Sequence, residues 1–202
     1  MQLLIDSGAA IDSKSEYIET PLYLAAWKGH KEVVQLLFQH GAAIDSQSKD
    51  ACTPLHLTSR DGHTDVVNLL INNGATIDSK REDLETPLHF AASEGHTEVV
   101  QSLLQYGAAI DSQNKDAHTP LYLACMNGHT DVVKLLIDTG ATIDVKNKDS
   151  RTMLHQAAMS GHVDVASRLL DSGTNTDQNP LNTMYIQTEL LENDGIQMSH
   201  LD

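Results

Sequence analysis

The sequence has few aromatic residues, few cysteines and no long hydrophobic run. Phe, Trp and Tyr make up 4% of its 202 residues, so the packed layers must consist mainly of Ala, Leu and Val. No window approaches 18 uninterrupted apolar residues, which predicts that no helix spans a membrane. Because the N-terminus also lacks the basic and apolar segments of a signal peptide, we expect a soluble intracellular protein, cytoplasmic or nuclear.

Positive charge is scarce as well. The chain contains 13 Lys and Arg residues against 28 Asp and Glu residues, a formal net charge of −15. This charge repels nucleic-acid phosphates and anionic lipids, which argues against both as partners. The sequence also lacks His-Glu-x-x-His, Cys-x-x-Cys, Gly-x-Ser-x-Gly and phosphate-loop motifs. We therefore expect no catalysis, no metal ion and no cofactor.

What the sequence does contain is a strict repeat. Thr-Pro-Leu, or Thr-Met-Leu in the last case, begins at Thr20, Thr53, Thr86, Thr119 and Thr152, each 33 residues after the one before. Gly-His recurs with the same period at Gly29, Gly62, Gly95, Gly128 and Gly161, and a further glycine at Gly8, Gly41, Gly74, Gly107, Gly140 and Gly173. Three markers with one period predict a repeat architecture.

Each marker predicts a local structure. Thr followed by Pro favours a helix start, so Thr20 opens a first helix that extends to about Lys28 and stops at Gly29. Apolar residues at helical spacing then predict a second helix, with Gly41 as its left-handed C-terminal residue. The polar stretch that follows, 46–50, is rich in turn formers and predicts a protruding, hairpin-like loop.

The combination of these motifs on a 33-residue step resembles the ankyrin repeat family over about residues 1–179. The resemblance implies an all-α solenoid of helix-turn-helix units with hairpin-like loops, curved so that first helices and loops line a concave surface that binds other proteins. The family usually has Gly two residues before the Thr, whereas this chain has Ile18, Ala51, Leu84, Ala117 and Ser150. We therefore expect loop tips of a different conformation. Asp replaces the family's frequent Asn at the loop start, at Asp45, Asp78, Asp111 and Asp144, where we expect turn-forming, solvated residues.

The repeat also predicts the domain organisation. Residues 1–14 align with the second helix of a repeat whose first helix is missing, so we expect the sequence to be a fragment of a longer chain. Five full repeats are predicted at 15–47, 48–80, 81–113, 114–146 and 147–179. Residues 180–202 are predicted to hold a capping helix, at about 180–191, and an acidic tail.

Most histidines and both cysteines fit a structural role. The five Gly-His residues and His56, His89 and His155 recur in register, as inter-repeat hydrogen bonding or capping predicts. Cys125 aligns with small first-helix residues and is expected to be buried, whereas Cys52 occupies a variable loop position and is expected to be an exposed thiol. Their different phases exclude a disulfide between them.

Positions that vary between repeats are the candidates for partner binding. Just before Gly-His they are Trp27, Lys28, Arg60, Asp61, Ser93, Glu94, Met126, Asn127, Met159 and Ser160, and just before Thr they are Glu19, Cys52, Glu85, His118 and Arg151. Trp27 and Arg60 are the first choices because both types are enriched in binding hot spots, and Met126 and Met159 form an adaptable apolar strip. The alternative is that Trp27 covers the first layer and the others are ordinary solvated variation.

The leading functional hypothesis is a scaffold or adaptor that binds another protein on its concave surface, as a monomer or as part of a longer chain. An alternative is the targeting segment of a larger enzyme, such as a kinase or a ubiquitin-ligase subunit. A repeat with no selected partner is a third possibility, because fold alone does not settle function.

Overall fold

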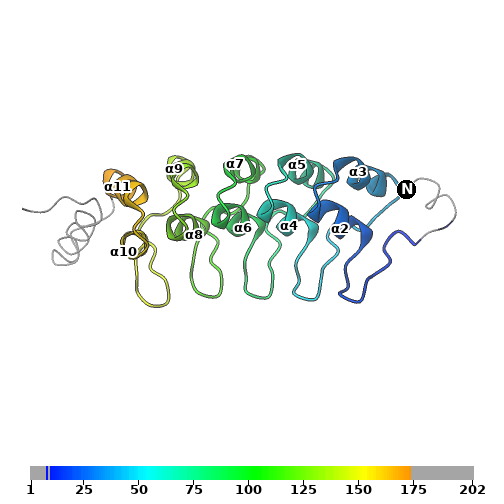
Figure 1. Cartoon of the computed structure of the whole chain (residues 1–202), viewed down its shortest axis with the longest axis horizontal. Helices are drawn as coiled ribbons and strands as arrows, with labels where there is room; N and C mark the ends of the chain where they lie inside the picture. Colours follow the sequence, from blue (N-terminus) through cyan, green and yellow to red (C-terminus); the bar gives the residue numbers. More distant parts are fainter. Residues whose placement is uncertain (1–7, 9, 174–202) are drawn as a thin grey trace, which may run out of the picture.

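The computed structural model describes residue 8 and residues 10–173, where the chain forms five helix pairs stacked in one row (Figure 1). The first helices are α2 (Pro21–Trp27), α4 (Pro54–Arg60), α6 (Pro87–Ser93), α8 (Pro120–Met126) and α10 (Met153–Met159). The second helices are α3 (Lys31–Gln39), α5 (Thr64–Asn72), α7 (Thr97–Gln105), α9 (Thr130–Asp138) and α11 (Val163–Asp171). The predicted all-α solenoid is confirmed. The expected capping helix at 180–191 and the first residues of the partial repeat, 1–7, lie outside the described residues.

The first helices begin where the sequence predicts. Thr20 Oγ1 accepts a hydrogen bond from the backbone N–H of Tyr23 at 3.2 Å, and Pro21 occupies the first helical position. In the next pair the cap is reciprocal, because the backbone N–H of Thr53 also donates to His56 Nδ1 at 3.1 Å. In the third pair the backbone N–H of Thr86 donates to His89 in the same way. In the fourth pair, as in the first, the threonine hydroxyl accepts the backbone N–H of a tyrosine, Tyr122. Histidine after Thr-Pro-Leu is therefore a capping residue.

The core is continuous along the array. One fully buried leucine column runs through the first helices at Leu22, Leu55, Leu88 and Leu121, and a second runs through the second helices at Leu37, Leu70, Leu103, Leu136 and Leu169. Small alanines beside them let neighbouring first helices approach closely. Each helix pair thus buries its apolar side chains against the next pair, as a solenoid requires.

A ladder of Gly-His contacts joins neighbouring pairs. His63 Nε2 lies 3.1 Å from the backbone oxygen of Trp27, one repeat earlier, and His96 Nε2 lies 2.8 Å from that of Arg60. His129 and His162 continue the ladder onto Ser93 and Met126. These contacts satisfy carbonyl groups left unpaired at the ends of the first helices. The predicted inter-repeat role of these histidines is confirmed.

We expect Gly62→Ala to destabilise the array by about 3 kcal/mol, because it combines backbone strain with a clash. Gly62 has a φ of +76°, and a Cβ there would lie 2.7 Å from the ring of His96. Gly74→Ala is the matched control, since Gly74 has a φ of +95° but open space around it; it should lose only about 1–2 kcal/mol. Equal losses of unfolding free energy in urea would contradict a packing role for the ladder.

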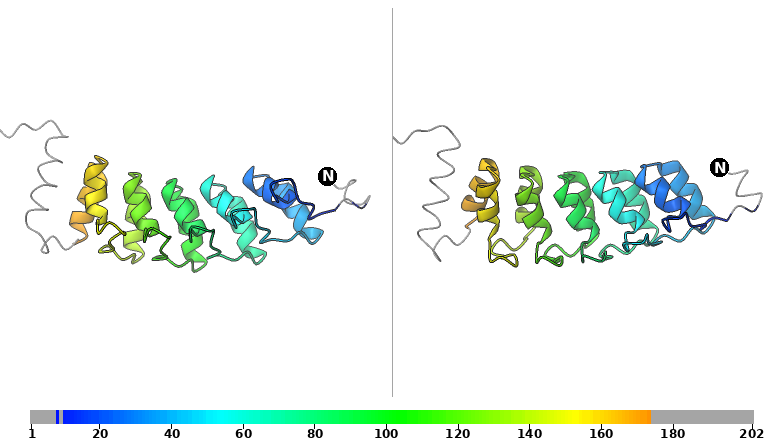
Figure 2. Two further views of the ribbon diagram at one scale, coloured as in Figure 1. Left: turned by 90° about the horizontal axis from the view of Figure 1, so that it is seen from below. Right: turned by 60° about the horizontal axis from the view of Figure 1, so that its bottom comes forward.

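The loops between pairs are hairpins that project beyond the first helices (Figure 2). In the third hairpin the Arg81 N–H donates to the Glu85 oxygen at 3.0 Å, and the Leu84 N–H donates to the Arg81 oxygen at 3.0 Å. Leu84 has a φ of +65°, the left-handed residue that closes a three-residue hairpin loop. Ile18, Ala51, Ala117 and Ser150 adopt the same conformation, with φ between 58° and 66°. The expectation of altered tips is wrong, because the hairpin hydrogen bonds impose the left-handed conformation whichever residue is present.

The aspartates at the hairpin starts connect one repeat to the next. Asp45 accepts hydrogen bonds from Thr76, from the backbone N–H at 3.2 Å and from the hydroxyl at 2.7 Å. Asp111 holds Thr142 in the same way, at 3.0 and 2.7 Å. Each of these two aspartates accepts a hydrogen bond from a backbone N–H 31 residues later. They therefore link neighbouring repeats in addition to lying in turns.

Candidate functional site

The first helices and the hairpins together form one surface, here called the first-helix face. Figure 1 places the hairpins below the row formed by α2, α4, α6, α8 and α10. The variable residues before Gly-His are the last residues and C-caps of these helices, so they lie in one row along the array. Those before Thr end the hairpins, at the opposite ends of the same helices. The two predicted rows therefore border one face.

A small apolar cluster lies at the N-terminal end of this face, separate from the main core. Tyr23, Cys52 and Leu57 are each 6–7% exposed, and the half-buried Trp27 packs against them. The Lys28 ammonium lies 3.8 Å from the centre of the Trp27 ring, a cation–π contact. Burial raises the pKa of Tyr23 to about 12 and also raises that of the Cys52 thiol. The expectation that Cys52 is exposed is wrong, because aromatic side chains of the preceding repeat cover it.

Arg60 follows in the next repeat. Its Nε lies 2.8 Å from Asp61 Oδ1, and the hydrogen bond to this carboxylate raises the pKa of Arg60. The pair is partly exposed, with 38% of the Arg60 side chain accessible, so it adds little to stability. The guanidinium group is instead fixed in position on the face.

The structure adds two residues that the sequence did not single out. Arg81 lies 5.4 Å from the Phe90 ring, and its guanidinium also lies 3.6 Å from Asp83 and 4.0 Å from Glu85. Phe90 occupies a position that holds Leu in three repeats, at Leu24, Leu57 and Leu123, and it is half-buried. The signal available in the sequence was the single aromatic residue in that column. Burial raises the pKa of Glu85, which also accepts a hydrogen bond from Asn114 at 3.3 Å.

The C-terminal half of the face is less charged. The ring of His118 stacks on Tyr122 with 4.3 Å between ring centres, and burial lowers the pKa of His118. Asn127 Nδ2 donates to the backbone oxygen of Ser93 at 2.8 Å. Met159 is 60% exposed, whereas Met126 is half-buried against the core. The two methionines thus form only a partly exposed strip.

The remaining predicted residues are solvated or half-exposed. Glu94, Arg151 and Ser160 are exposed, and Glu19 is half-buried beside the first hairpin, where its carboxylate accepts a hydrogen bond from Ser15 at 3.1 Å. The structure therefore brings Trp27, Lys28, Arg60 and Asp61 together at one end, and spreads the others along the face.

Two ankyrin family models match the chain. The one described as ankyrin repeats (3 copies) matches residues 41–114 and again 88–180, and the one described as ankyrin repeats (many copies) matches residues 1–38. The chain belongs to the ankyrin repeat family. Ankyrin repeats generally mediate protein–protein interactions and are typically non-catalytic. Comparison with curated proteins found no match.

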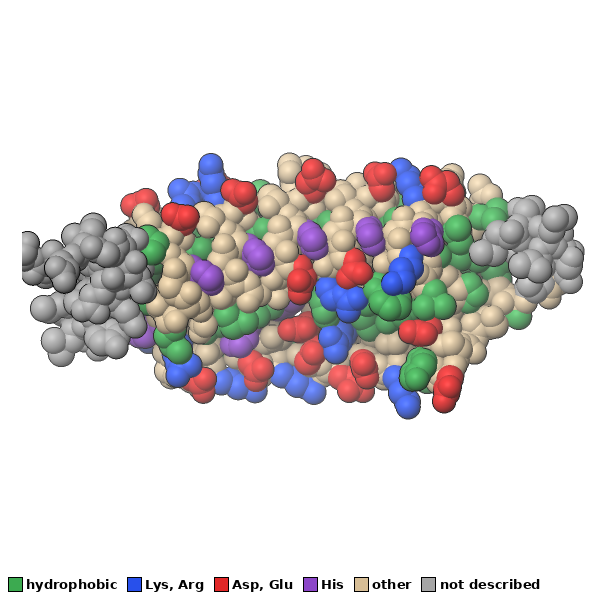
Figure 3. Space-filling model, in the orientation of Figure 1, with side chains coloured by type: hydrophobic (Ala, Val, Ile, Leu, Met, Phe, Trp, Pro, Cys, Tyr) green, Lys and Arg blue, Asp and Glu red, His purple; other side chains and the backbone are tan. Residues whose placement is uncertain are grey.

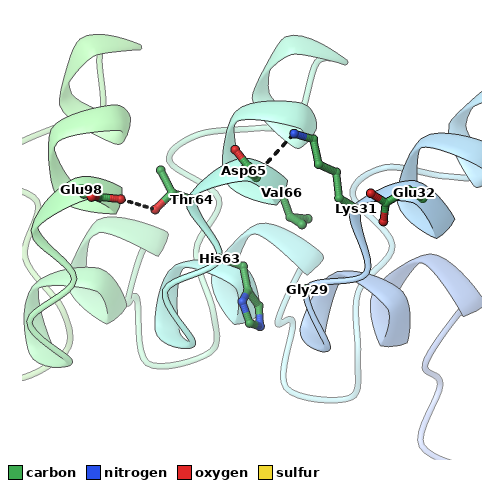
Figure 4. A pocket seen from close by; sticks show the side chains of 8 residues that line it. All are labelled: Gly29, Lys31, Glu32, His63, Thr64, Asp65, Val66 and Glu98. Atoms are coloured by element: carbon green, nitrogen blue, oxygen red, sulfur yellow. Dashed lines mark hydrogen bonds and ion pairs between the residues drawn. The ribbon is translucent and has the colours of Figure 1, made fainter.

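A surface hollow of about 520 Å³ lies between the starts of α3, α5 and α7, directly after the row that contains Trp27 and Arg60 (Figure 4). Two pairs of its polar side chains contact each other: Lys31 Nζ lies 3.1 Å from Asp65, and the Thr64 hydroxyl lies 3.5 Å from Glu98. His63 in its wall belongs to the Gly-His ladder. Within residues 8 and 10–173 we find neither a group of three metal-ligating side chains nor a helix long and apolar enough to cross a membrane.

Proposed function

We propose that this ankyrin array is a scaffold or adaptor that binds a partner protein on its first-helix face, with Trp27 and Arg60 as the main anchors. The observation that carries the proposal is the half-buried Trp27, which contacts a small apolar cluster outside the core and the cation of Lys28. Arg60 ends the next first helix, α4, as Trp27 ends α2. Trp and Arg in partly desolvated positions are the residue types that dominate binding energy at protein interfaces.

A rigid frame supports this role. The backbone oxygens of Trp27 and Arg60 are held by His63 and His96 at 3.1 and 2.8 Å, so the two anchors project from a fixed backbone. A partner that binds a preformed surface loses less entropy than one that must order it. We place this interaction inside the cell, in the cytoplasm or the nucleus, where two reduced thiols are ordinary.

The test is affinity capture with the Trp27→Ala, Arg60→Ala double variant. We expect partners captured by the wild type to be lost by at least about tenfold, since hot-spot truncations of this kind remove about 2 kcal/mol or more. The matched control is Tyr106→Ala with Lys134→Ala, which removes an exposed aromatic side chain at the C-cap of α7 and a cation from α9. If both variants capture the same proteins as the wild type, the anchors are wrongly assigned.

A further inference from the structure

Two helix ends of the array carry an Asn-Gly dipeptide, and the sequence contains no other. Asn73 is the C-cap of α5, a second helix, and Asn127 is the C-cap of α8, a first helix. The glycines that follow them, Gly74 and Gly128, have φ of 95° and 75°, so the helix end requires a residue without a side chain there. Such a residue leaves its backbone nitrogen uncovered, open to reaction with the preceding side chain.

An asparagine followed by glycine can modify itself without an enzyme. The deprotonated backbone nitrogen of the glycine attacks Cγ of the asparagine, and the bond between Cγ and the side-chain nitrogen breaks, so that a succinimide ring forms and ammonia leaves. Water then adds to one of the two ring carbonyl groups, and the ring opens to aspartate or isoaspartate. One water molecule is consumed and one ammonia is released. In a folded protein ring closure is limiting, because it needs a local opening that lets Cγ and the glycine nitrogen approach each other.

The two dipeptides have the same backbone conformation. Asn73 has φ −97° and ψ 9°, and Asn127 has φ −97° and ψ 1°. In each, the glycine N–H donates to the backbone oxygen three residues earlier, at 2.9 Å from Gly74 and 3.4 Å from Gly128. The longer bond alone would favour reaction at Gly128, but both bonds lie in the last turn of a helix and open when that turn frays. Contacts with other repeats therefore decide which asparagine reacts.

Asn127 and Gly128 are held by the repeats on both sides. Asn127 Nδ2 donates to the backbone oxygen of Ser93 at 2.8 Å and to its hydroxyl at 3.0 Å. Histidine side chains form a row along the array (Figure 3), and the ring of His162 in the Gly-His ladder covers Gly128, where a Cβ would lie 2.7 Å from the ring. His162 Nε2 also lies 3.1 Å from the backbone oxygen of Met126. Ring closure here must therefore break contacts with the third and the fifth helix pair.

Asn73 and Gly74 lie at a more open helix end. Both residues are exposed, and the position of a Cβ on Gly74 has open space around it. Asn73 Nδ2 donates within its own helix, to the backbone oxygen of Leu69 at 2.8 Å. We infer that Asn73-Gly74 is a self-modification site, at which the folded array converts asparagine to aspartate and isoaspartate, whereas neighbouring repeats protect Asn127. This inference does not depend on the proposed partner surface.

The modification changes the end of α5. Aspartate at position 73 lacks the amide donor that bonds to Leu69, and it places a negative charge at a helix C-terminus, where the carbonyl groups already carry partial negative charge. Isoaspartate also lengthens the backbone just before Gly74. Both products loosen the second repeat, and because each repeat is supported by its neighbours, they lower the stability of the array.

The test follows both dipeptides in one sample of the wild-type chain. The protein is incubated at mildly alkaline pH and digested, and the peptides that contain residues 73 and 127 are measured by mass spectrometry, which detects the exchange of an amide for a carboxyl group. In the folded protein we expect conversion of Asn73 to be at least about tenfold faster than that of Asn127, which must also break two hydrogen bonds and a ring contact. In concentrated urea, where these contacts are lost, the two rates should become similar.

Matched variants test the protection and the consequence. His162→Ala uncovers Gly128 and should accelerate conversion of Asn127, whereas His96→Ala removes the equivalent ring over Gly62 and should accelerate it less, although each variant loses one ladder contact. Asn73→Asp reproduces one product and should lower the midpoint of thermal unfolding. Asn72→Asp adds the same charge one residue earlier but keeps an acceptor for the Tyr106 hydroxyl, so it should lower the midpoint less.

The rates in the folded protein decide the inference. Equal rates at the two dipeptides, or faster conversion at Asn127, would overturn it. So would an Asn73 that stays intact in the folded protein over the time in which the urea-unfolded chain converts. Faster conversion at Asn73 that disappears in urea supports it, because the difference then comes from the fold and not from the neighbouring residues in the sequence.

Discussion

Replacing all five left-handed hairpin residues with glycine should stabilise the array by about 4 kcal/mol. Ile18, Ala51, Leu84, Ala117 and Ser150 have φ between 58° and 66°, a conformation that costs an L-residue about 1–2 kcal/mol. Glycine removes this strain but gains about 0.5–1 kcal/mol of extra chain entropy in the unfolded state. The net gain is about 0.5–1 kcal/mol per site, and the contributions should add because the sites lie in separate repeats.

The measurement is the midpoint of thermal unfolding, which should rise by about 10 °C for the five-site variant. Gln47→Gly with Gln113→Gly is the matched control, since both residues are exposed, lie in the same hairpins and do not have positive φ. It should lower stability by about 0.5–1 kcal/mol per site. A five-site variant that melts at or below the wild-type temperature would show that the left-handed residues are not strained.

The helices could be predicted from the sequence because their signals are local. The Thr20 hydroxyl caps the start of α2, and Pro21 supplies the helical φ of its first residue. Gly29 follows the end of the helix with a positive φ. None of these signals depends on contacts with other repeats. The hairpin tips were predicted wrongly because residue type was taken as the determinant. Hydrogen bonds within the hairpin and between hairpins, such as Lys115 N–H to the Asp83 oxygen at 2.8 Å, fix the backbone there instead.

The candidate site was harder to predict because its contacts join different repeats. Cys52 is buried by Tyr23 and Trp27, 29 and 25 residues earlier, and no local pattern reports that packing. Phe90 occupies the position of Leu24, Leu57 and Leu123 in other repeats, and its contact with Arg81 marks it as part of the face. Trp27 and Arg60 were proposed as anchors because they occupy positions that vary between repeats, which is the kind of signal that a single sequence gives for a binding surface.

Acid should destabilise this protein well above the pH at which carboxylates titrate. His56 and His89 are fully buried, and burial lowers the pKa of each from 6.5 to about 4. Each Nδ1 accepts a backbone N–H at 3.1 Å, so protonation would place two donors face to face. The unfolded chain takes up these protons near pH 6.5 and the folded chain only near pH 4. Stability is therefore complete above pH 6.5 and is lost as the pH falls towards 4.

Each histidine should contribute about 2 kcal/mol of lost stability at pH 5, or about 4 kcal/mol together, measured by urea unfolding between pH 8 and pH 5. His56→Tyr with His89→Tyr should remove most of this dependence. Tyrosine fits the same register at Tyr23 and Tyr122 and does not titrate in this range. Ring proton shifts of His56 or His89 that titrate near pH 6.5 in the folded protein would contradict this account.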